Sequence, residues 1–187
     1  MTTRLFSFAA GDTGPWRVTR IEAITGESLP AAKRLAIISD SEIQPDPSSP
    51  WVLRGITSHE RYVVREERNE IVAKQLPLGR AEANCAALIA LRKNDAWWAL
   101  TQDERLNIFK QKSHHTRIGL QSFPELARRL HHCRDLSETE PFDFITWFEY
   151  PASDEAKFNQ LLADLRAIEE WTYIEREVDI RLVREDA

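Results

Sequence analysis

The stretch FDFITWFEYPASDEAKFNQLLADLRAIEEWTYIEREVDIRL, residues 142–182, predicts a strand, a helix and a second strand in direct succession. Residues 142–150 are rich in the aromatic and β-branched side chains that favour strands. A helix is predicted over residues 153–170, where apolar side chains recur at helical spacing: Phe158, Leu161, Leu162, Leu165 and Ile168. The final strand is predicted from the alternation of Ile174, Val178, Ile180 and Leu182. The chain therefore ends in a β-α-β unit.

Helices and one further strand are expected upstream of this unit. Residues 81–100 combine strong helix formers with apolar side chains that share one helical face: Leu88, Leu91 and Trp98. Thr101-Gln-Asp-Glu104 has the spacing of a capping box, so we expect it to open a helix that runs towards His115. Ser122-Phe-Pro-Glu125 repeats the pattern and predicts another helix start. Residues 130–136 are predicted to form a strand.

The first half of the chain is predicted to be rich in strands, at residues 16–24, 33–39, 51–57 and 61–65. The proline- and serine-rich residues 40–50 are expected to form a loop. Strands, then helices, then a β-β-α-β order indicate an α+β fold. We expect a ferredoxin-like C-terminal domain over residues 81–187 and a reduced ferredoxin-like, β-rich N-terminal half over residues 1–80. No clear internal repeat supports the second part of this prediction.

Composition limits the class of protein. The 187 residues are 42% hydrophobic and carry a net charge of −5, without a run of Lys and Arg, which argues against nucleic-acid binding. No apolar stretch is long enough for a membrane span or a signal peptide. Cys85 and Cys133 are expected to be reduced thiols, so we predict a cytoplasmic protein. Six Trp and eight Phe suit a cavity that holds a large flat ligand.

The pair His114-His115 is the first candidate for chemistry. If the preceding helix continues to the pair, His115 shares a partly apolar face with Ile108, whereas His114 falls on a polar face. His115 is therefore the better candidate for a metal or haem ligand. The alternative is an exposed pair at a helix end, where imidazole interacts favourably with the helix dipole.

Two cationic positions add to this candidate. Arg128 and Arg129 are expected about 100° apart on a helix, so one at most lines a given cavity, and Arg128 lies opposite the apolar stripe. Its planar guanidinium suits an oxyanion, although a solvated charged face is the alternative. Lys93 and Trp97 share a helical face, either as a site for a ligand carboxylate or as a core Trp beside an outward-pointing Lys.

The other motifs of the sequence do not support a specific site. His131-His-Cys133 offers metal donors, but without a second Cys-x-x-Cys motif a closed zinc site is not supported. The chain contains no Gly-rich phosphate loop, Gly-x-Ser-x-Gly elbow or His-Glu-x-x-His motif. The residues alone thus indicate a metal or haem site that handles a small anion, with purely structural roles left open.

Several stretches of the chain resemble the chlorite dismutase family, specifically its short, dimeric subgroup. The resemblance covers roughly residue 51 to the C-terminus and is carried by RGITSH (54–59), RY (61–62), ALIALRK (87–93), WW (97–98), TQDER (101–105), KSHH (112–115), LARRLHHCRD (126–135), EPFDFITWFEY (140–150) and EEWTYIEREVDIRL (169–182). It implies a fold of the dimeric α+β-barrel type, a homodimer, and haem b as the cofactor.

The resemblance also implies roles for individual residues. It makes His115 the proximal ligand of the haem iron and Arg128 the distal arginine. Gln75 corresponds to a distal glutamine that can hydrogen-bond this arginine. Glu170 matches the carboxylate that accepts a hydrogen bond from the proximal imidazole, with the adjacent Glu169 as the alternative.

Further residues are implied to contact the cofactor, around the haem edge and its propionates: Lys93, Trp97, Trp98 and Tyr62. Phe123 stands near the distal pocket, where relatives often carry Leu. This departure leaves open how substrate reaches the pocket.

The implied reaction is the decomposition of chlorite to chloride and dioxygen, through oxygen transfer to haem iron and recombination. Arg128 would hold the small anion during these steps. A coprohaem decarboxylase of haem synthesis is the first alternative, but that branch typically lacks the distal arginine. A dye-decolorising-type peroxidase would need a carboxylate beside Arg128. A haem-binding protein without turnover is the third alternative.

Overall fold

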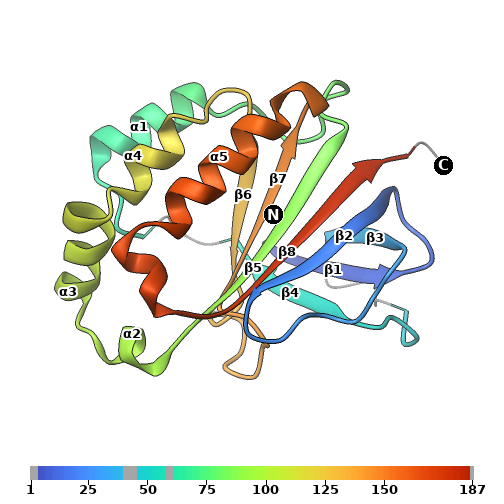
Figure 1. The fold of residues 1–187 in the computed structure, drawn as a ribbon, viewed down its shortest axis with the longest axis horizontal. Coiled ribbons are helices and arrows are strands. Elements are labelled where there is room, and N and C mark those ends of the chain that lie inside the picture. The colour runs from blue at the N-terminus through green and yellow to red at the C-terminus, as the bar shows by residue number, and fades with distance from the viewer. Residues whose placement is uncertain (1–3, 40–45, 58–60, 186–187) are drawn as a thin grey trace.

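The computed structural model describes residues 4–39, 46–57 and 61–185. Over these residues eight strands close an antiparallel barrel in the order β1-β3-β2-β8-β5-β7-β6-β4, and the helices cover one side of it (Figure 1). The strands are β1 (Leu5–Gly11), β2 (Trp16–Thr25), β3 (Arg34–Ser39), β4 (Val52–Ile56), β5 (Cys85–Lys93), β6 (Ala127–His132), β7 (Phe144–Tyr150) and β8 (Ile174–Arg184). The helices are α1 (Arg65–Lys74), α2 (Asp95–Ala99), α3 (Gln102–Leu106), α4 (His115–Leu120) and α5 (Glu155–Arg166), with a π-helix at Asn107–Lys112 and 3₁₀ turns at Ala152–Asp154 and Glu169–Tyr173.

The α+β class and several elements agree with the sequence predictions. The strands predicted at residues 16–24, 33–39 and 51–57 are confirmed as β2, β3 and β4. The terminal β-α-β unit is confirmed as β7, α5 and β8, with the helix ending at Arg166. The predicted loop over residues 40–50 lies partly outside the described residues.

One core fills the barrel, and both halves of the sequence build it. The inward-facing side chains include Phe8 and Leu53 from the first half and Leu88, Trp147 and Ile180 from the second, all at most 1% exposed. Alternation along each strand places these residues on the inner face of the barrel. Residues 1–80 and 81–187 therefore share a single hydrophobic interior.

The helix predicted over residues 81–100 is wrong. Residues 85–93 form β5, and only the short helix α2 follows it. Ala86, Leu88 and Ala90 of β5 point into the barrel, while Ala87 and Ile89 pack under α5 in a second hydrophobic cluster. A strand buried on both faces carries an almost continuous apolar run, which has no period of two to separate it from a buried helix.

Two other predicted elements are also wrong, and the strand predicted at residues 130–136 is shifted along the chain. No helix starts at Ser122-Phe-Pro-Glu125, since these residues form turns around a cis Phe123-Pro124 peptide, and β6 runs from Ala127 to His132 instead of over residues 130–136. The strand predicted at residues 61–65 is interrupted by the left-handed conformation of Tyr62, at φ 62°. Helix α1 then begins at Arg65, and the Glu67 carboxylate accepts a hydrogen bond from the backbone amide of Val64.

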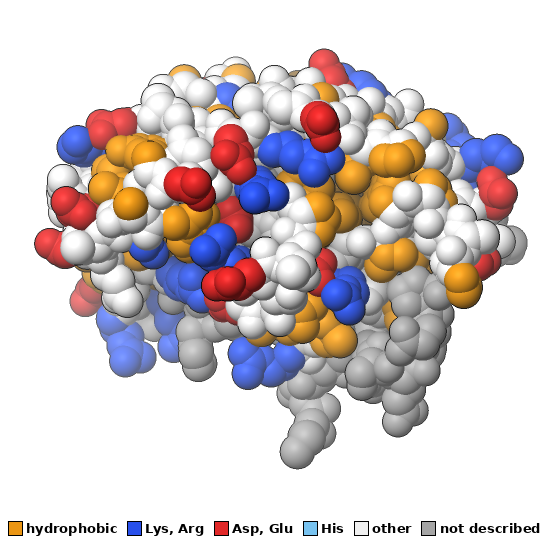
Figure 2. Space-filling view, turned by 90° about the horizontal axis from the view of Figure 1, so that it is seen from below, with side chains coloured by type: hydrophobic (Ala, Val, Ile, Leu, Met, Phe, Trp, Pro, Cys, Tyr) orange, Lys and Arg blue, Asp and Glu red, His pale blue; other side chains and the backbone are white. Residues whose placement is uncertain are grey.

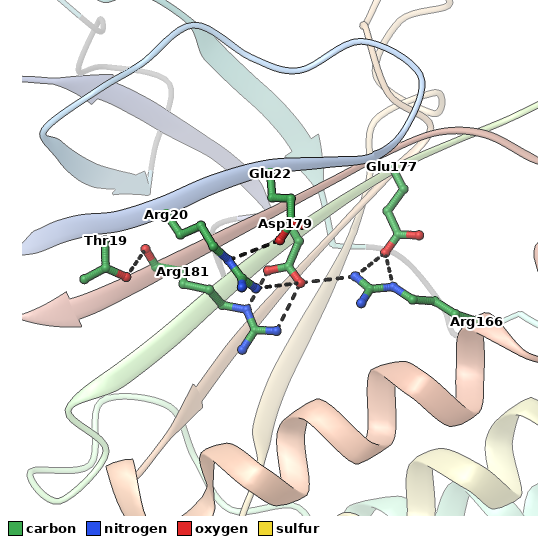
Figure 3. A network of polar contacts seen from close by, with 7 residues as sticks. All are labelled: Thr19, Arg20, Glu22, Arg166, Glu177, Asp179 and Arg181. Atoms are coloured by element: carbon green, nitrogen blue, oxygen red, sulfur yellow. Dashed lines mark hydrogen bonds and ion pairs between the residues drawn. The ribbon is translucent and has the colours of Figure 1, made fainter.

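Buried carboxylates on the outer face of β8 pair with arginines of α5, of the neighbouring strand β2 and of β8 itself (Figure 3). Asp179 and Glu177 of β8 are both fully buried. Arg166 of α5 donates to Glu177 at 2.6 Å and to Asp179 at 3.1 Å. Arg181 donates to Asp179 from the same strand, and Arg20 of β2 lies 3.7 Å from it. Because each buried carboxylate has an arginine partner, the cost of removing its charge from water is offset.

The surface is mixed in character. On the face seen in Figure 2, acidic and basic side chains alternate and hydrophobic side chains show between them. In the parts of the chain that the structure describes, no helix is long and apolar enough to cross a membrane.

His131 predicts a specific loss of stability in acid. It lies in the barrel between Phe6 and Phe8, is 0% exposed, and its Nε2 accepts a hydrogen bond from Arg129. Burial, and then the Arg129 cation, lowers the pKa of His131 from 6.5 to about 4. The unfolded chain therefore takes up a proton between pH 6.5 and 4 that the folded chain does not, so this contribution to stability is complete above pH 6.5 and falls as the pH falls.

We expect the wild type to lose roughly 3 kcal/mol more unfolding free energy than His131→Gln between pH 6.5 and 4. Glutamine keeps an acceptor for Arg129 but does not titrate. Urea unfolding of both proteins across this pH range measures the difference, and parallel curves would show that His131 does not titrate as described.

Candidate functional site

A cavity of about 340 Å³ lies between the outer face of the barrel and its helices. Its floor consists of alternate residues from three neighbouring strands: Ile89 and Leu91 of β5, Phe144, Thr146 and Phe148 of β7, and Arg128, Leu130 and His132 of β6. Arg128 and Arg129 were predicted about 100° apart on a helix. They lie instead on a strand and point to opposite faces, so that Arg128 faces the cavity and Arg129 stacks on Phe6 within the barrel.

His115 lines the cavity from the helical side. The continuous helix predicted from Thr101 to His115 is wrong in its second half. The Thr101 capping box is confirmed, but α3 passes into the π-helix at Asn107, and His114 then adopts a left-handed conformation at φ 50°. The chain turns there, and His115 becomes the first residue of α4 rather than the last residue of the preceding helix.

A buried carboxylate holds the His115 ring. Nδ1 of His115 lies 2.7 Å from Oε2 of Glu170, whose backbone amide donates to the hydroxyl of Ser113. A carboxylate accepts only, so Nδ1 is the donor in this contact and Nε2 is the ring nitrogen left to bind a metal. Glu169, the alternative in the sequence, pairs with Lys112 on the surface. The structure thus distinguishes the two adjacent glutamates.

Lys93 completes this arrangement on the other oxygen of Glu170. Its Nζ donates to Oε1 at 2.6 Å, and both side chains are nearly fully buried. Burial alone raises the pKa of Glu170, but its contacts with His115 and Lys93 outweigh burial and bring the pKa to about 2. Burial also lowers the pKa of Lys93, although Glu170 and Asp143 act in the opposite direction. The carboxylate is therefore ionised throughout the physiological range.

The two tryptophans lie at the same end of the floor. Lys93 and Trp97 do not share a helix face, yet they are in contact, with Nζ 3.2 Å from the indole centroid. Trp98 stacks on Phe144 and donates from Nε1 to Asp143 at 3.3 Å. Asp143 also accepts from the backbone amide of Lys93 at 2.7 Å, which ties the end of β5 to β7.

The remaining predicted site residues line the same cavity. Gln75 follows α1 and donates to the backbone carbonyl of Arg128 at 3.0 Å, so it holds the strand rather than the guanidinium. The Arg128 guanidinium lies 6.0 Å from the centre of the Phe123 ring. Tyr62 stands further along, where its ring packs against Phe109 at 5.4 Å.

Comparison with known proteins bears on this geometry. No family model matches the chain. A solved structure of the dimeric chlorite dismutase from Nitrobacter winogradskyi is 51% identical, with a TM-score of 0.88 over 96% of this chain and 99% of that one. The chain belongs to the chlorite dismutase family. The curated chlorite dismutase of Ideonella dechloratans is 36% identical over 88 residues, which span 47% of this chain but only 28% of that protein.

More distant chlorite dismutases share the fold. The enzyme from Candidatus Nitrospira defluvii, solved in complex with imidazole, is 20% identical, with a TM-score of 0.59 over 81% of this chain and 57% of that one. A mutant of the same enzyme is 15% identical, with a TM-score of 0.68 over 99% of this chain and 93% of that one.

The cavity of this chlorite dismutase homologue fits a haem on its own chemistry. Among the described residues, no group of three or more His, Cys, Asp and Glu side chains is arranged to hold a metal ion. A metal bound through His115 alone needs its other ligands from a cofactor, as a porphyrin supplies them. The broad floor of aromatic and aliphatic side chains also suits a planar ligand.

Sequence reasoning missed two aromatic neighbours of the candidate ligand. The Phe109 ring stacks on His115 with centroids 4.4 Å apart and planes 19° apart, and Trp171 lies near it at 6.4 Å and 25°. Together with Glu170 they restrict rotation of the imidazole. Phe109 falls within the π-helix, and the periodicity of an α-helix does not predict its position. Trp171 directly follows Glu170, so it could have been found from its place in the sequence.

Proposed function

We propose that the protein is a haem b enzyme that decomposes chlorite to chloride and dioxygen. The observation that carries this proposal is that one cavity is lined both by His115, held by a buried carboxylate, and by Arg128 from the opposing sheet. A histidine for iron and a permanent cation for a small anion are the protein groups this reaction needs. Both oxygens of dioxygen come from the same chlorite, so the reaction consumes no external oxidant, reductant or proton.

The chain's own residues have separate tasks in this proposal. His115 binds iron through Nε2, and Glu170 keeps the proton on Nδ1 and raises the basicity of the ring. When bound, the haem supplies an iron centre that accepts and returns an oxygen atom. Arg128 would hold the substrate anion and keep its chlorine-containing fragment in the cavity until the oxygen–oxygen bond forms and chloride leaves. Gln75 fixes the strand position of Arg128 through its backbone carbonyl.

Arg128→Ala is expected to lower kcat/KM for chlorite by roughly ten- to a hundredfold, the worth of a hydrogen bond to a charged group, while haem remains bound. Arg128→Lys retains the charge, and its kcat/KM is expected to lie between the values of the wild type and Arg128→Ala. Oxygen release at matched haem content measures the effect. Unchanged kcat/KM in Arg128→Ala would remove this residue from the mechanism.

The Arg128 guanidinium also argues against the alternatives in haem synthesis and peroxidase chemistry. The coprohaem decarboxylases typically lack this arginine, and a dye-decolorising-type peroxidase needs a distal carboxylate beside it. A haem carrier without turnover predicts tight haem binding and no dioxygen. Measuring dioxygen release therefore distinguishes a chlorite-decomposing enzyme from a haem carrier.

We extend the proposal to the assembly and location of the protein. The N. winogradskyi neighbour is dimeric, which supports a homodimer here. The division into a reduced ferredoxin-like half, residues 1–80, and a ferredoxin-like half, residues 81–187, is retained as the finer description of the barrel. Free Cys85 and Cys133 support the reducing cytoplasm as its compartment.

A further inference from the structure

One short turn carries two neighbouring side chains that have separate partners. In the 3₁₀ turn Glu169–Tyr173, Glu170 accepts a hydrogen bond from His115, with 2.7 Å between Oε2 and Nδ1. The next residue, Trp171, donates from its indole Nε1 to Oε2 of Glu177 at 2.8 Å. Glu177 is fully buried on the outer face of β8. The indole hydrogen bond therefore ties the turn that presents Glu170 to the barrel.

A guanidinium fixes Glu177 from the other side. Arg166, the last residue of α5, donates to Oε1 of Glu177 from Nε at 2.8 Å and from Nη2 at 2.6 Å (Figure 3). The two carboxylate oxygens are thus used separately, Oε1 by Arg166 and Oε2 by Trp171. Because two N–H groups of a planar guanidinium hold the carboxylate, it cannot rotate freely and Oε2 points in one direction. The indole is therefore anchored to β8 and to α5 at once.

The anchored indole lies beside the candidate iron ligand. Trp171 is half-buried and lines the cavity, and its ring is 6.4 Å from the His115 ring, with the two planes 25° apart. Because successive residues of one short turn move together, a displaced indole also displaces Glu170 relative to Nδ1 of His115. The strength of that hydrogen bond determines how basic the imidazole is towards a metal.

An apolar pair in place of Arg166 and Glu177 would serve packing alone. At this point β8 is already paired through its backbone with β2 and β5, where Glu177 lies opposite Thr25 and Leu91. A buried ion pair is often no better for stability than well-packed hydrophobic residues of similar volume, because both charges lose their hydration. The carboxylate does supply one thing that an apolar side chain cannot, an oriented acceptor for an indole N–H. Its place in the fold thus points to the control of Trp171.

We propose that Glu177 and Arg166 are positioning residues for the iron ligand. They hold Trp171, and with it the turn that carries Glu170, in the place where Glu170 meets His115. Neither residue lines the cavity, so they act only through the indole and the turn. This inference rests on the proposed function in one respect, that His115 binds haem iron, and it does not depend on the substrate.

Trp171→Phe is the first test, because it keeps an aromatic ring beside His115 and removes the N–H donor. The frequency of the iron–histidine stretch, measured by resonance Raman spectroscopy on the ferrous haem-loaded protein, reports how much anionic character the imidazole has. We expect a lower frequency than in the wild type, since Glu170 is no longer held against the ring. The reduction potential should rise, by less than in Glu170→Gln, because the carboxylate itself is still present.

Two carboxylate-to-amide variants form a matched pair. Glu177→Gln leaves one oxygen, which goes to the charged Arg166, so an NH₂ group faces the indole N–H and the frequency should fall as in Trp171→Phe. Asp179→Asn changes the other carboxylate that Arg166 contacts, whereas the single indole hydrogen goes to Glu177, so the wild-type frequency should be kept. The double variant Trp171→Phe/Glu177→Gln should shift no further than either single variant, because both remove the same hydrogen bond.

The possible outcomes bear on the proposal in different ways. An unchanged frequency in Trp171→Phe would overturn it, and so would additive shifts in the double variant. A fall in Asp179→Asn as large as in Glu177→Gln would also overturn it, because a buried charge and not the indole hydrogen bond would then act on the iron. If the wild type binds no haem, the proposed function and this inference fail together. If the frequencies shift as expected in a protein that releases no dioxygen from chlorite, the proposed function alone fails.

Discussion

His115→Ala is expected to weaken haem binding by more than about 100-fold, because even the outer groups that orient a metal ligand contribute roughly 10–100-fold to affinity. The absorption spectrum of histidine-ligated ferric haem should disappear with it. The reason is geometric, since His115 is the cavity-lining histidine whose ring is fixed by Glu170 and stacked on Phe109. Titration of the apoprotein with haem, followed in the visible range, measures both effects.

His114→Asn is the matched control for this prediction. His114 is exposed and left-handed at φ 50°, a conformation that asparagine tolerates better than most residues. Its haem affinity and spectrum should equal those of the wild type. Added imidazole should restore a histidine-like spectrum to His115→Ala by occupying the vacated space. An unchanged spectrum in His115→Ala without imidazole would show that another residue binds the iron.

Glu170→Gln is expected to lower the free energy of unfolding of the apoprotein by about 3–5 kcal/mol, the usual cost of breaking a buried ion pair from one side. Lys93 then stays buried beside a neutral amide, with its side chain only 4% exposed. Glutamine still accepts from His115 but no longer gives the ring anionic character. In the haem-loaded protein the iron should therefore become easier to reduce.

The neighbouring glutamate and a double variant separate charge from packing. Glu169→Gln removes the partner of Lys112 at the surface, where a single ion pair contributes at most about 1 kcal/mol. Glu170→Gln with Lys93→Met should recover most of the lost stability but not the original reduction potential. If Glu169→Gln and Glu170→Gln lower the free energy of unfolding equally in urea, the buried Lys93–Glu170 pair stabilises the fold no more than a surface pair does.

The fold was predictable from the sequence where one face of an element is polar. The helix α5 and the strand β2 follow from their periodicity, since solvent on one side leaves a clear pattern. The strand β8 keeps its alternation because its outer face carries buried charges, such as Glu177 and Asp179, that pair with arginines. The strand β5 was predicted as a helix because its two faces meet two different hydrophobic clusters. The closure of all strands into one barrel depends on long-range pairing, such as β1 with β4, for which a single sequence contains no signal.

The candidate site was predicted in its residues but not in its geometry. Helical phase favoured His115 over His114 on the assumption of a continuous helix, whereas the π-helix and the left-handed His114 set its actual position. Arg128 was assigned to a helix and lies on a strand. His132 was weighed as a zinc donor, with a core or surface role favoured, because its place on the cavity floor is not visible in a linear sequence.

An oxygen-electrode measurement on the haem-loaded protein with chlorite tests the central claim most directly. We predict one dioxygen and one chloride for each chlorite consumed, without any added reductant, because both oxygens of the product come from one substrate anion. Haem-loaded protein that consumes no chlorite, or consumes it without releasing dioxygen, would contradict the account.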